Sequence, residues 1–251
     1  MESLDTAVIL AAGRGARLEE LSHNMPKPLV EVGGRSILSN LVESLIDNGF
    51  VKIVLVVGYR SDLIIDHLQG YAGGAELVFV ENPDFDTTNN IYSLWLAREH
   101  LHRGFCLFEA DVFFQSGLIG RMMRHPAENV MVVDRYTPRM DGTVVSLDGR
   151  GRVAAVHLKR SQGEDFDYSG KFKTVNFYRI GAGFYADYFR DDLDSYIEDG
   201  EVSYYYEAII RDGIDAGHSF AALRTGDLSW WEIDTKEDLD RAEAIFEPQM
   251  G

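Results

Sequence analysis

The chain has 251 residues, of which 45% are hydrophobic and 26% are charged, and its formal net charge is −17. This length and composition allow one large α/β domain with its own core, so we expect a single domain over residues 1–251. The excess of acidic residues argues against a surface that binds nucleic acid, because such surfaces are basic.

Two further features of the sequence concern the compartment of the protein. The single cysteine, Cys106, excludes an internal disulfide and is typical of a reducing cytosol. No apolar stretch approaches the ~20 residues that a membrane span needs, and the acidic N-terminus does not resemble a signal peptide. We therefore expect a cytoplasmic protein that has no membrane partner.

The first predicted strand, residues 7–10, leads directly into a glycine-rich turn. Gly13 and Gly15 allow the backbone to come close to a bulky anion, and free N–H groups after a strand can cradle a phosphate. Arg14 and Arg17 add positive charge, and arginine can hold a phosphate through two parallel hydrogen bonds. The GK[ST] ending of a P-loop is absent, so the two glycines alone would also fit an ordinary turn.

Lys27 follows this turn at a position where the backbone is restricted. Lys27 stands between Pro26 and Pro28, and proline fixes its own backbone while disfavouring helix in the residue before it. We therefore expect Lys27 to lie on a stiff extended segment. Together with the turn, it predicts a site that binds a polyphosphate.

Helix and strand patterns then alternate along the chain. Residues 36–48 and 61–69 have helical spacing, with Ser61 as the expected cap of the second helix. Residues 52–57 and 76–81 are apolar strands. This order predicts an α/β fold with a doubly wound, mostly parallel, Rossmann-like sheet that binds ligands beyond the carboxyl ends of its strands.

A polar loop at residues 82–90 precedes a predicted helix over 91–102. Its last three residues can all cap a helix, and one helix needs only one cap. Short amide and hydroxyl side chains beside a phosphate pocket can also read the edge of a base. The candidates for that role are Asn82, Thr88 and Asn89.

Two acidic residues follow predicted strands that lie far apart in the sequence. Asp111 follows a buried strand over 104–110, a good position for a metal ligand, although it could instead cap the segment that begins near Gln115. Asp234 leaves an apolar strand near the end of the chain, and Glu232 could replace or assist it.

The pattern of predicted elements changes in the second half of the chain. A strand over 129–134 continues the sheet, and residues 143–147 with 152–158 predict a hairpin. With a strand over 173–179, this hairpin would form a small antiparallel extension over an acceptor site. The remaining predicted elements are helices over 185–198, 204–215 and 235–246 and a strand over 220–225.

The motif LAAGxGxRL followed by PKPL resembles the signature of nucleotidyltransferases that join a nucleoside triphosphate to a sugar phosphate or a phosphocholine-like alcohol, a fold shared with MobA-like enzymes. The segment NNIYSLWLA is most similar to the phosphocholine and phosphonate cytidylyltransferase branch. The resemblance implies that Arg17 and Lys27 contact the triphosphate as catalytic residues, and that Asp111 and Asp234 hold Mg²⁺. It also implies that the loop before the helix selects the base. The glycine-rich motif would contribute Leu10, Ala12, Gly13, Arg14 and Gly15 to nucleotide binding.

Nucleotidyl transfer needs no general base in this setting, because a phosphate with a second pKa of ~6 is already mostly ionised at neutral pH. Lys159 and Lys173 are candidates to bind the phosphorus group of the acceptor, although each would also fit a surface lysine. Tyr204 and Glu207 are candidates to bind an ammonium group of the acceptor. Core packing is the alternative for the neighbouring tyrosines.

The sequence therefore favours a CTP-dependent cytidylyltransferase that transfers CMP to phosphocholine or a 2-aminoethylphosphonate-like acceptor and releases pyrophosphate. CTP and this acceptor are the expected partners, and a homodimer is compatible with the sequence. Two alternatives stay open: a sugar-1-phosphate nucleotidyltransferase that uses UTP or dTTP, and a nucleotide-sensing module without catalytic activity. The joint presence of the four candidate residues at the triphosphate argues against the sensor. They are Arg17, Lys27, Asp111 and Asp234.

Overall fold

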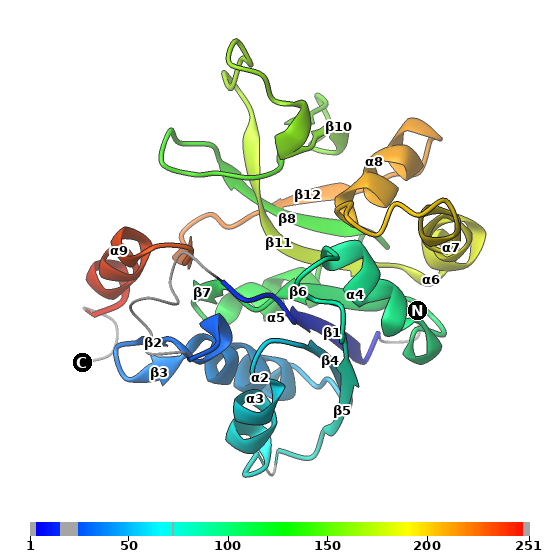
Figure 1. The fold of residues 1–251 in the computed structure, drawn as a ribbon. Helices are drawn as coiled ribbons and strands as arrows, with labels where there is room; N and C mark the ends of the chain where they lie inside the picture. Colours follow the sequence, from blue (N-terminus) through cyan, green and yellow to red (C-terminus); the bar gives the residue numbers. More distant parts are fainter. Residues whose placement is uncertain (1–3, 16–24, 72, 248–251) are drawn as a thin grey trace.

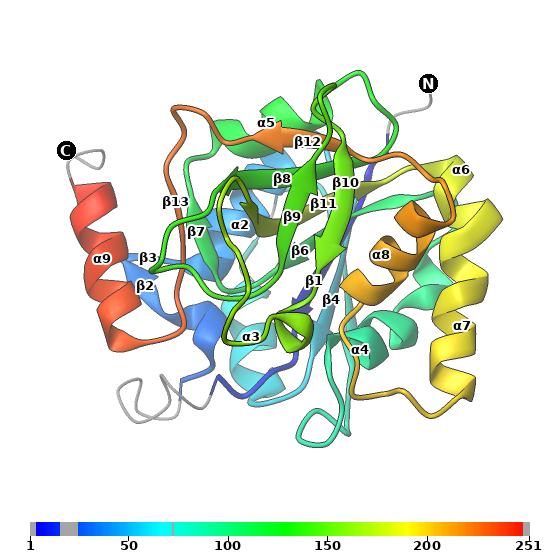
Figure 2. The same ribbon diagram turned by 90° about the horizontal axis from the view of Figure 1, so that it is seen from above.

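The computed structural model has a central sheet of nine strands with helices on both of its faces (Figures 1 and 2). Within the part of the chain that it describes, no helix is both long and apolar enough to cross a lipid bilayer. The structure describes residues 4–15, 25–71 and 73–247.

One half of the sheet is parallel. Its strands lie in the order β6 (Phe105–Glu109), β1 (Thr6–Ala11), β4 (Lys52–Val57) and β5 (Glu76–Glu81). The first half of the chain builds these strands by crossing over through helices, as the alternating pattern predicts. The carboxyl ends of the four strands therefore meet at one edge of the sheet.

The other half of the sheet contains the antiparallel extension. The long strand β11 (Phe172–Ile180) pairs in antiparallel fashion with β6, with β8 (Val130–Arg135) and with β9 (Val144–Leu147). β9 forms the predicted hairpin with β10 (Val153–His157), and β12 (Ala221–Arg224) runs parallel to β8. The predicted fold class is confirmed.

The alternating side chains of β1 divide the interior into two cores. Val8 and Leu10 belong to the core on one face, whereas Ala7 and Ile9 belong to the core on the other. The first core is covered by α4 (Asn90–Leu96), α7 (Arg190–Glu198) and α8 (Glu207–Asp215), and the second by α2 (Ile37–Asp47), α3 (Ser61–Leu68) and α5 (Gly117–Met123).

A short two-stranded ribbon joins two distant parts of the chain. β7 (Val112–Phe114) pairs with β13 (Trp230–Glu232), and the N–H of Ile233 donates a hydrogen bond of 2.8 Å to the carbonyl oxygen of Asp111. Helix α9 (Lys236–Phe246) packs beside this ribbon (Figure 2). The ribbon brings the segment after β6 next to the segment after β13.

Two predicted helices have different bounds in the structure. The helix expected over 91–102 ends at Leu96 and is followed by a 3₁₀ turn, because the chain must turn to bury Leu101 in the core. The helix expected from residue 204 begins at Glu207, and the N–H of Tyr206 just before it donates to the side chain of Asn90.

Two smaller predictions also need correction. Ser61 does not cap α3 but is its first residue, after Arg60 in the left-handed region. The chain is helical from Ala182, before the expected start at residue 185, and passes through a π turn before α7. The remaining elements are β2 (Glu31–Val32), β3 (Arg35–Ser36), α6 (Ala182–Phe184), the π turn (Tyr185–Phe189) and 3₁₀ turns at Lys27–Leu29, Arg98–His100 and Lys159–Ser161.

Candidate functional site

The glycine-rich turn lies directly beside Lys27. Gly15 has a positive φ of +63°, and a Cβ atom built on it would lie 2.9 Å from Cβ of Lys27. Lys27 does not lie on an extended segment as expected: it begins a 3₁₀ turn, in which the N–H of Leu29 donates to the carbonyl oxygen of Pro26. Pro26 before the turn and Val30 after it are extended.

The ammonium group of Lys27 joins the two aspartates that follow β6 and β13. Its Nζ atom lies 3.0 Å from Oδ2 of Asp111 and 2.5 Å from Oδ1 of Asp234. Burial alone would lower the pKa of Lys27, but the charges of the two aspartates outweigh burial and raise this pKa above its ordinary value. The structure thus brings together three residues that the sequence places far apart.

The two aspartates are a chemically suitable pair of ligands for a divalent cation. Oδ1 of Asp111 is buried and has no hydrogen-bond partner among the described residues, which leaves one carboxylate oxygen available. In the described part of the chain, no three or more His, Cys, Asp or Glu side chains are grouped to hold a metal. Mg²⁺ commonly binds through one or two carboxylates and completes its shell with water and substrate phosphates, so this pair fits that ion.

Glu232 is a third carboxylate next to these aspartates, and its partners are Asn176 and Lys173 instead of Lys27. Glu232 accepts a hydrogen bond of 3.1 Å from Nδ2 of Asn176 and forms an ion pair of 3.1 Å with Nζ of Lys173. Burial raises the pKa of Glu232 to about 7, and the charges of Asp111 and Asp234 act in the same direction. Glu232 therefore faces Lys173, whereas Asp234 faces Lys27.

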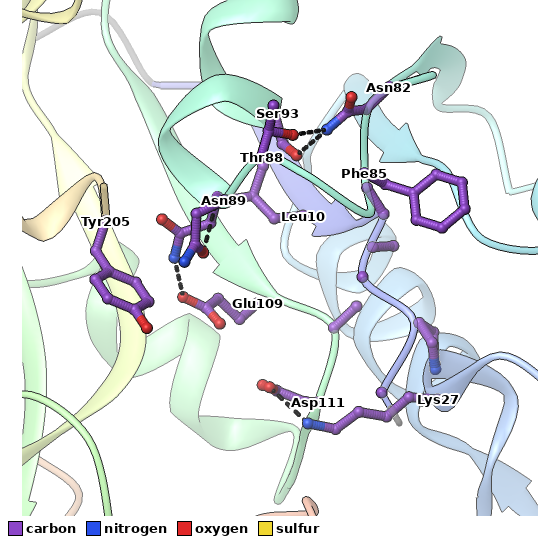
Figure 3. A pocket seen from close by; sticks show the side chains of 17 residues that line it. Leu10, Lys27, Asn82, Phe85, Thr88, Asn89, Ser93, Glu109, Asp111 and Tyr205 are labelled. Atoms are coloured by element: carbon purple, nitrogen blue, oxygen red, sulfur yellow. Dashed lines mark hydrogen bonds and ion pairs between the residues drawn. The ribbon is translucent and has the colours of Figure 1, made fainter. Parts of the chain in front are cut away.

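A cavity of about 240 Å³ opens between the glycine-rich turn, the carboxyl end of β6 and the start of α4 (Figure 3). Most of the predicted nucleotide-binding residues line it, and so do Lys27 and Asp111. Arg14 is not among the lining residues, and its guanidinium carbon lies 5.5 Å from the ring centre of Tyr59. Arg17 lies outside the described residues. The predicted residues that line the cavity are Leu10, Ala12, Gly13, Gly15, Lys27, Asn82, Thr88, Asn89 and Asp111.

The three residues expected to read a base are hydrogen-bonded within their own loop. The amide of Asn82 donates to the hydroxyls of Thr88 and Ser93, at 3.1 and 3.0 Å (Figure 3). Asn89 caps α4 by accepting a hydrogen bond from the N–H of Asn90. These contacts fix the shape of the cavity wall.

The sequence reasoning missed Glu109 as a lining residue. Its carboxylate accepts hydrogen bonds from Nδ2 of Asn90 at 3.2 Å and from the hydroxyl of Tyr206 at 2.8 Å. Burial raises the pKa of Glu109 well above its ordinary value, and the charge of Asp111 adds to this effect. Glu109 is the last residue of β6, and its place at the carboxyl end of a parallel strand was a usable signal.

The four residues predicted to bind the acceptor are dispersed. Lys159 forms an ion pair with Asp141 on the surface, and Lys173 is 1% exposed. Tyr204 packs its ring against the guanidinium of Arg160, 3.4 Å from the ring centre. Its neighbour Tyr205 lines the cavity instead.

Glu207, the fourth of these residues, is buried beneath the antiparallel extension. It accepts a hydrogen bond of 3.2 Å from the hydroxyl of Thr143, whereas Oε2 has no partner among the described residues. A second cavity, of about 260 Å³, lies on the side of Asp234 and Glu232. Its other lining residues include Arg139, Asp141, Trp230, Trp231, Glu237 and Asp238.

Comparisons with known proteins agree on one family. Residues 7–165 match the model of the MobA-like NTP transferase domain. CMP-5′-(3-aminopropyl)phosphonate synthase from Streptomyces rubellomurinus is 35% identical over 243 residues, which are 96% of this chain and 39% of that protein. The chain thus spans about two fifths of the length of this relative.

Two further proteins match over nearly their whole length. CTP:phosphoglutamine cytidylyltransferase from Campylobacter jejuni is 26% identical over 255 residues, which are 93% of this chain and 97% of that protein. The structure of CTP:phosphocholine cytidylyltransferase from Streptococcus pneumoniae superposes with a TM-score of 0.77 at 23% identity, covering 97% of this chain and 100% of the other. At this identity the superposition establishes a shared fold.

Proposed function

Because the chain belongs to the MobA-like NTP transferase family, we propose that it is a CTP-dependent cytidylyltransferase. It transfers CMP to a small phosphate or phosphonate acceptor and releases pyrophosphate. The observation that carries this proposal is the contact of Lys27 with Asp111 and Asp234 beside a glycine-rich turn. The relatives named for CTP and for phosphonate or phosphate acceptors support the choice of substrates.

The cavity of about 240 Å³ would take the nucleotide. The backbone at Gly13 and Gly15 would receive the polyphosphate, because glycine has no side chain to keep a bulky anion away from the backbone. The base would lie toward the loop that ends in Asn89, where Asn82 and Thr88 hold the wall in place. Arg17 is proposed to orient the β and γ phosphates.

The reaction itself is an in-line displacement. An anionic oxygen of the acceptor forms a bond to the α-phosphorus, and the bond from that phosphorus to the oxygen bridging the β-phosphate breaks. Pyrophosphate leaves with the bonding electrons, and Lys27 neutralises the charge that develops on it. No proton has to be removed from the acceptor, because its nucleophilic oxygen is already ionised.

Asp111 and Asp234 would hold Mg²⁺, which supplies Lewis-acid neutralisation of the α-phosphate when bound. The contribution of the chain is to keep these carboxylates at a fixed separation. The backbone hydrogen bond from Ile233 to Asp111 and the pairing of β7 with β13 provide that rigidity.

The acceptor is proposed to be an aminoalkylphosphonate or phosphocholine-like molecule. Burial raises the pKa of Glu109, Glu207 and Glu232, and a cationic end of the acceptor would stabilise the ionised form of these groups, which favours such an acceptor. Lys159 and Lys173 are proposed to assist with the phosphorus group and Tyr204 with the ammonium group. The ion pair of Lys173 with Glu232 would have to open for this contact.

Pyrophosphate release measured with each of CTP, UTP, dTTP, ATP and GTP tests this proposal. The acceptor panel contains 2-aminoethylphosphonate, phosphocholine and glucose-1-phosphate. We expect turnover with CTP and a cationic acceptor to exceed that of all other pairs. A preference for UTP or dTTP with glucose-1-phosphate would instead identify a sugar-1-phosphate enzyme.

The variant Asp111→Asn tests whether this carboxylate takes part in catalysis. We expect it to lower kcat by about 10²–10³-fold, because one charged group at the reacting phosphate is lost. Asp227→Asn, at a surface carboxylate paired with Arg121, is the matched control and should keep full activity. CTP binding without turnover by the unmodified chain would indicate a nucleotide sensor.

A further inference from the structure

In this structure the ammonium group of Lys27 occupies the space between the two proposed metal ligands. It lies within hydrogen-bond distance of both Asp111 and Asp234, and all three side chains are largely buried, with exposures of 11%, 17% and 26%. Two carboxylates this close together repel each other unless a cation stands between them. Lys27 is that cation here.

We propose that Lys27 is the resident counter-ion of the two aspartates, and that it competes with the metal until a nucleotide arrives. This inference rests on the proposed function, because it takes the two aspartates as the metal ligands. A divalent cation and an ammonium group need the same position between the carboxylates and repel each other. Metal therefore binds weakly to the empty protein and more tightly once Lys27 has another partner.

The nucleotide offers Lys27 that partner. The aliphatic stem of Lys27 packs against Gly15, in the turn where the polyphosphate is proposed to bind. A four-carbon stem with rotatable bonds lets the ammonium move from the carboxylates to a phosphate oxygen without any change in the backbone. The prolines at 26 and 28 restrict that backbone, so the exchange is confined to the side chain.

The exchange couples metal and nucleotide binding through one charged group. Nucleotides also chelate metal ions in solution, so tighter metal binding in the presence of CTP would not by itself distinguish the two effects. The distinguishing property is the affinity for metal in the absence of nucleotide. If Lys27 competes with the ion, removing its charge must strengthen metal binding to the empty protein.

The experiment is a titration with Mn²⁺ in the absence of nucleotide, in which electron paramagnetic resonance measures the unbound ion. Lys27→Met removes the charge at similar length, and Lys27→Arg keeps it. We expect Lys27→Met to bind Mn²⁺ about tenfold more tightly or better, because one strong local repulsion is lost, and Lys27→Arg to stay near the unmodified protein. Lys52→Met removes a lysine at the first residue of β4, at the opposite end of this strand from the site, and should leave Mn²⁺ binding unchanged.

Equal or weaker Mn²⁺ binding by Lys27→Met overturns the proposal. So does a gain that persists in the double variant Lys27→Met/Asp111→Asn, because the ion would then bind elsewhere. Thermal unfolding checks that each variant is folded. If Lys27→Met does not fold, the Mn²⁺ titration is repeated with Lys27→Gln, which also removes the charge. An absence of CTP turnover would remove the proposed function but leave this titration unaffected, so the two failures are distinguishable.

Discussion

A methyl group built on Gly15 would lie 2.9 Å from Cβ of Lys27, whereas one built on Gly13 would have nothing within 4 Å. Gly15 also has a φ of +63°, which disfavours any residue with a side chain. We expect Gly15→Ala to destabilise the fold by about 1–3 kcal/mol and to displace Lys27. Urea unfolding measures the first effect, and kcat with CTP measures the second.

Gly13→Ala is the matched control in the same turn. It should unfold like the unmodified protein, because its added methyl group meets no atom of the described residues. If the polyphosphate approaches the backbone at residue 13, the KM of the Gly13→Ala variant for CTP should nevertheless rise. Equal loss of stability in the two variants would contradict the structural distinction between these glycines.

Asn176 is a second position where the backbone is strained. It has a φ of 63° inside β11, at a point where the pairing of this strand with β8 shifts register. Its side chain holds Glu232 and accepts from Thr174. Asn176→Ala and Asn176→Gly both lose these bonds, but only glycine relieves the strain.

We therefore expect Asn176→Gly to be more stable than Asn176→Ala by about 1 kcal/mol in urea unfolding. Both should be less stable than the unmodified protein, because a buried carboxylate loses a donor. An alanine variant at least as stable as the glycine variant would show that the backbone at this position is not strained.

The buried carboxyl of Glu207 makes stability depend on pH. Burial raises its pKa above the ordinary value of 4.5, although Lys173 opposes this effect. Glu109, Tyr178 and Tyr206 also face it, and the charge of Glu109 disfavours its ionisation. The folded state thus holds this proton more tightly than the unfolded state does.

The contribution of this group to stability is therefore complete below pH 4.5 and is lost as the pH rises through the higher folded-state pKa. Glu207→Gln cannot ionise and should escape this loss. We expect the Tm of the unmodified protein, relative to that of Glu207→Gln, to fall as the pH rises above 4.5. A difference in Tm that stays constant with pH would contradict the expectation.

The sequence predicts the outline of the fold and part of the site for physical reasons that can be named. Strands such as β1 and β4 are continuous apolar runs between helical segments, and this pattern has few other interpretations. The approach of Asp111 to Asp234 is predicted only through the family resemblance. Its structural cause is the ribbon of β7 and β13, whose three-residue strands are too short to carry a pairing signal.

The acceptor side is where sequence reasoning was weakest. Tyr204 was predicted to bind an ammonium group through its aromatic face, but its ring packs against Arg160 and Tyr205 lines the cavity instead. Lys173 has the charge of a phosphate ligand, yet its ion pair with Glu232 is a tertiary contact that no local pattern reveals. Glu109 ends the buried strand β6, and apart from this position nothing in the apolar sequence of that strand indicates that its carboxyl group lines a cavity.

The central claim is that Asp111 and Asp234 converge with Lys27 on one metal-bound triphosphate. Electron paramagnetic resonance of Mn²⁺ bound together with CTP tests it most directly, because phosphorus nuclei next to the ion give a measurable coupling. We predict this coupling in the unmodified protein, and a loss of affinity of at least about tenfold in both Asp111→Asn and Asp234→Asn. Asp227→Asn, at the surface carboxylate paired with Arg121, should bind like the unmodified protein. Unchanged binding of Mn²⁺ with CTP in both aspartate variants would contradict the account.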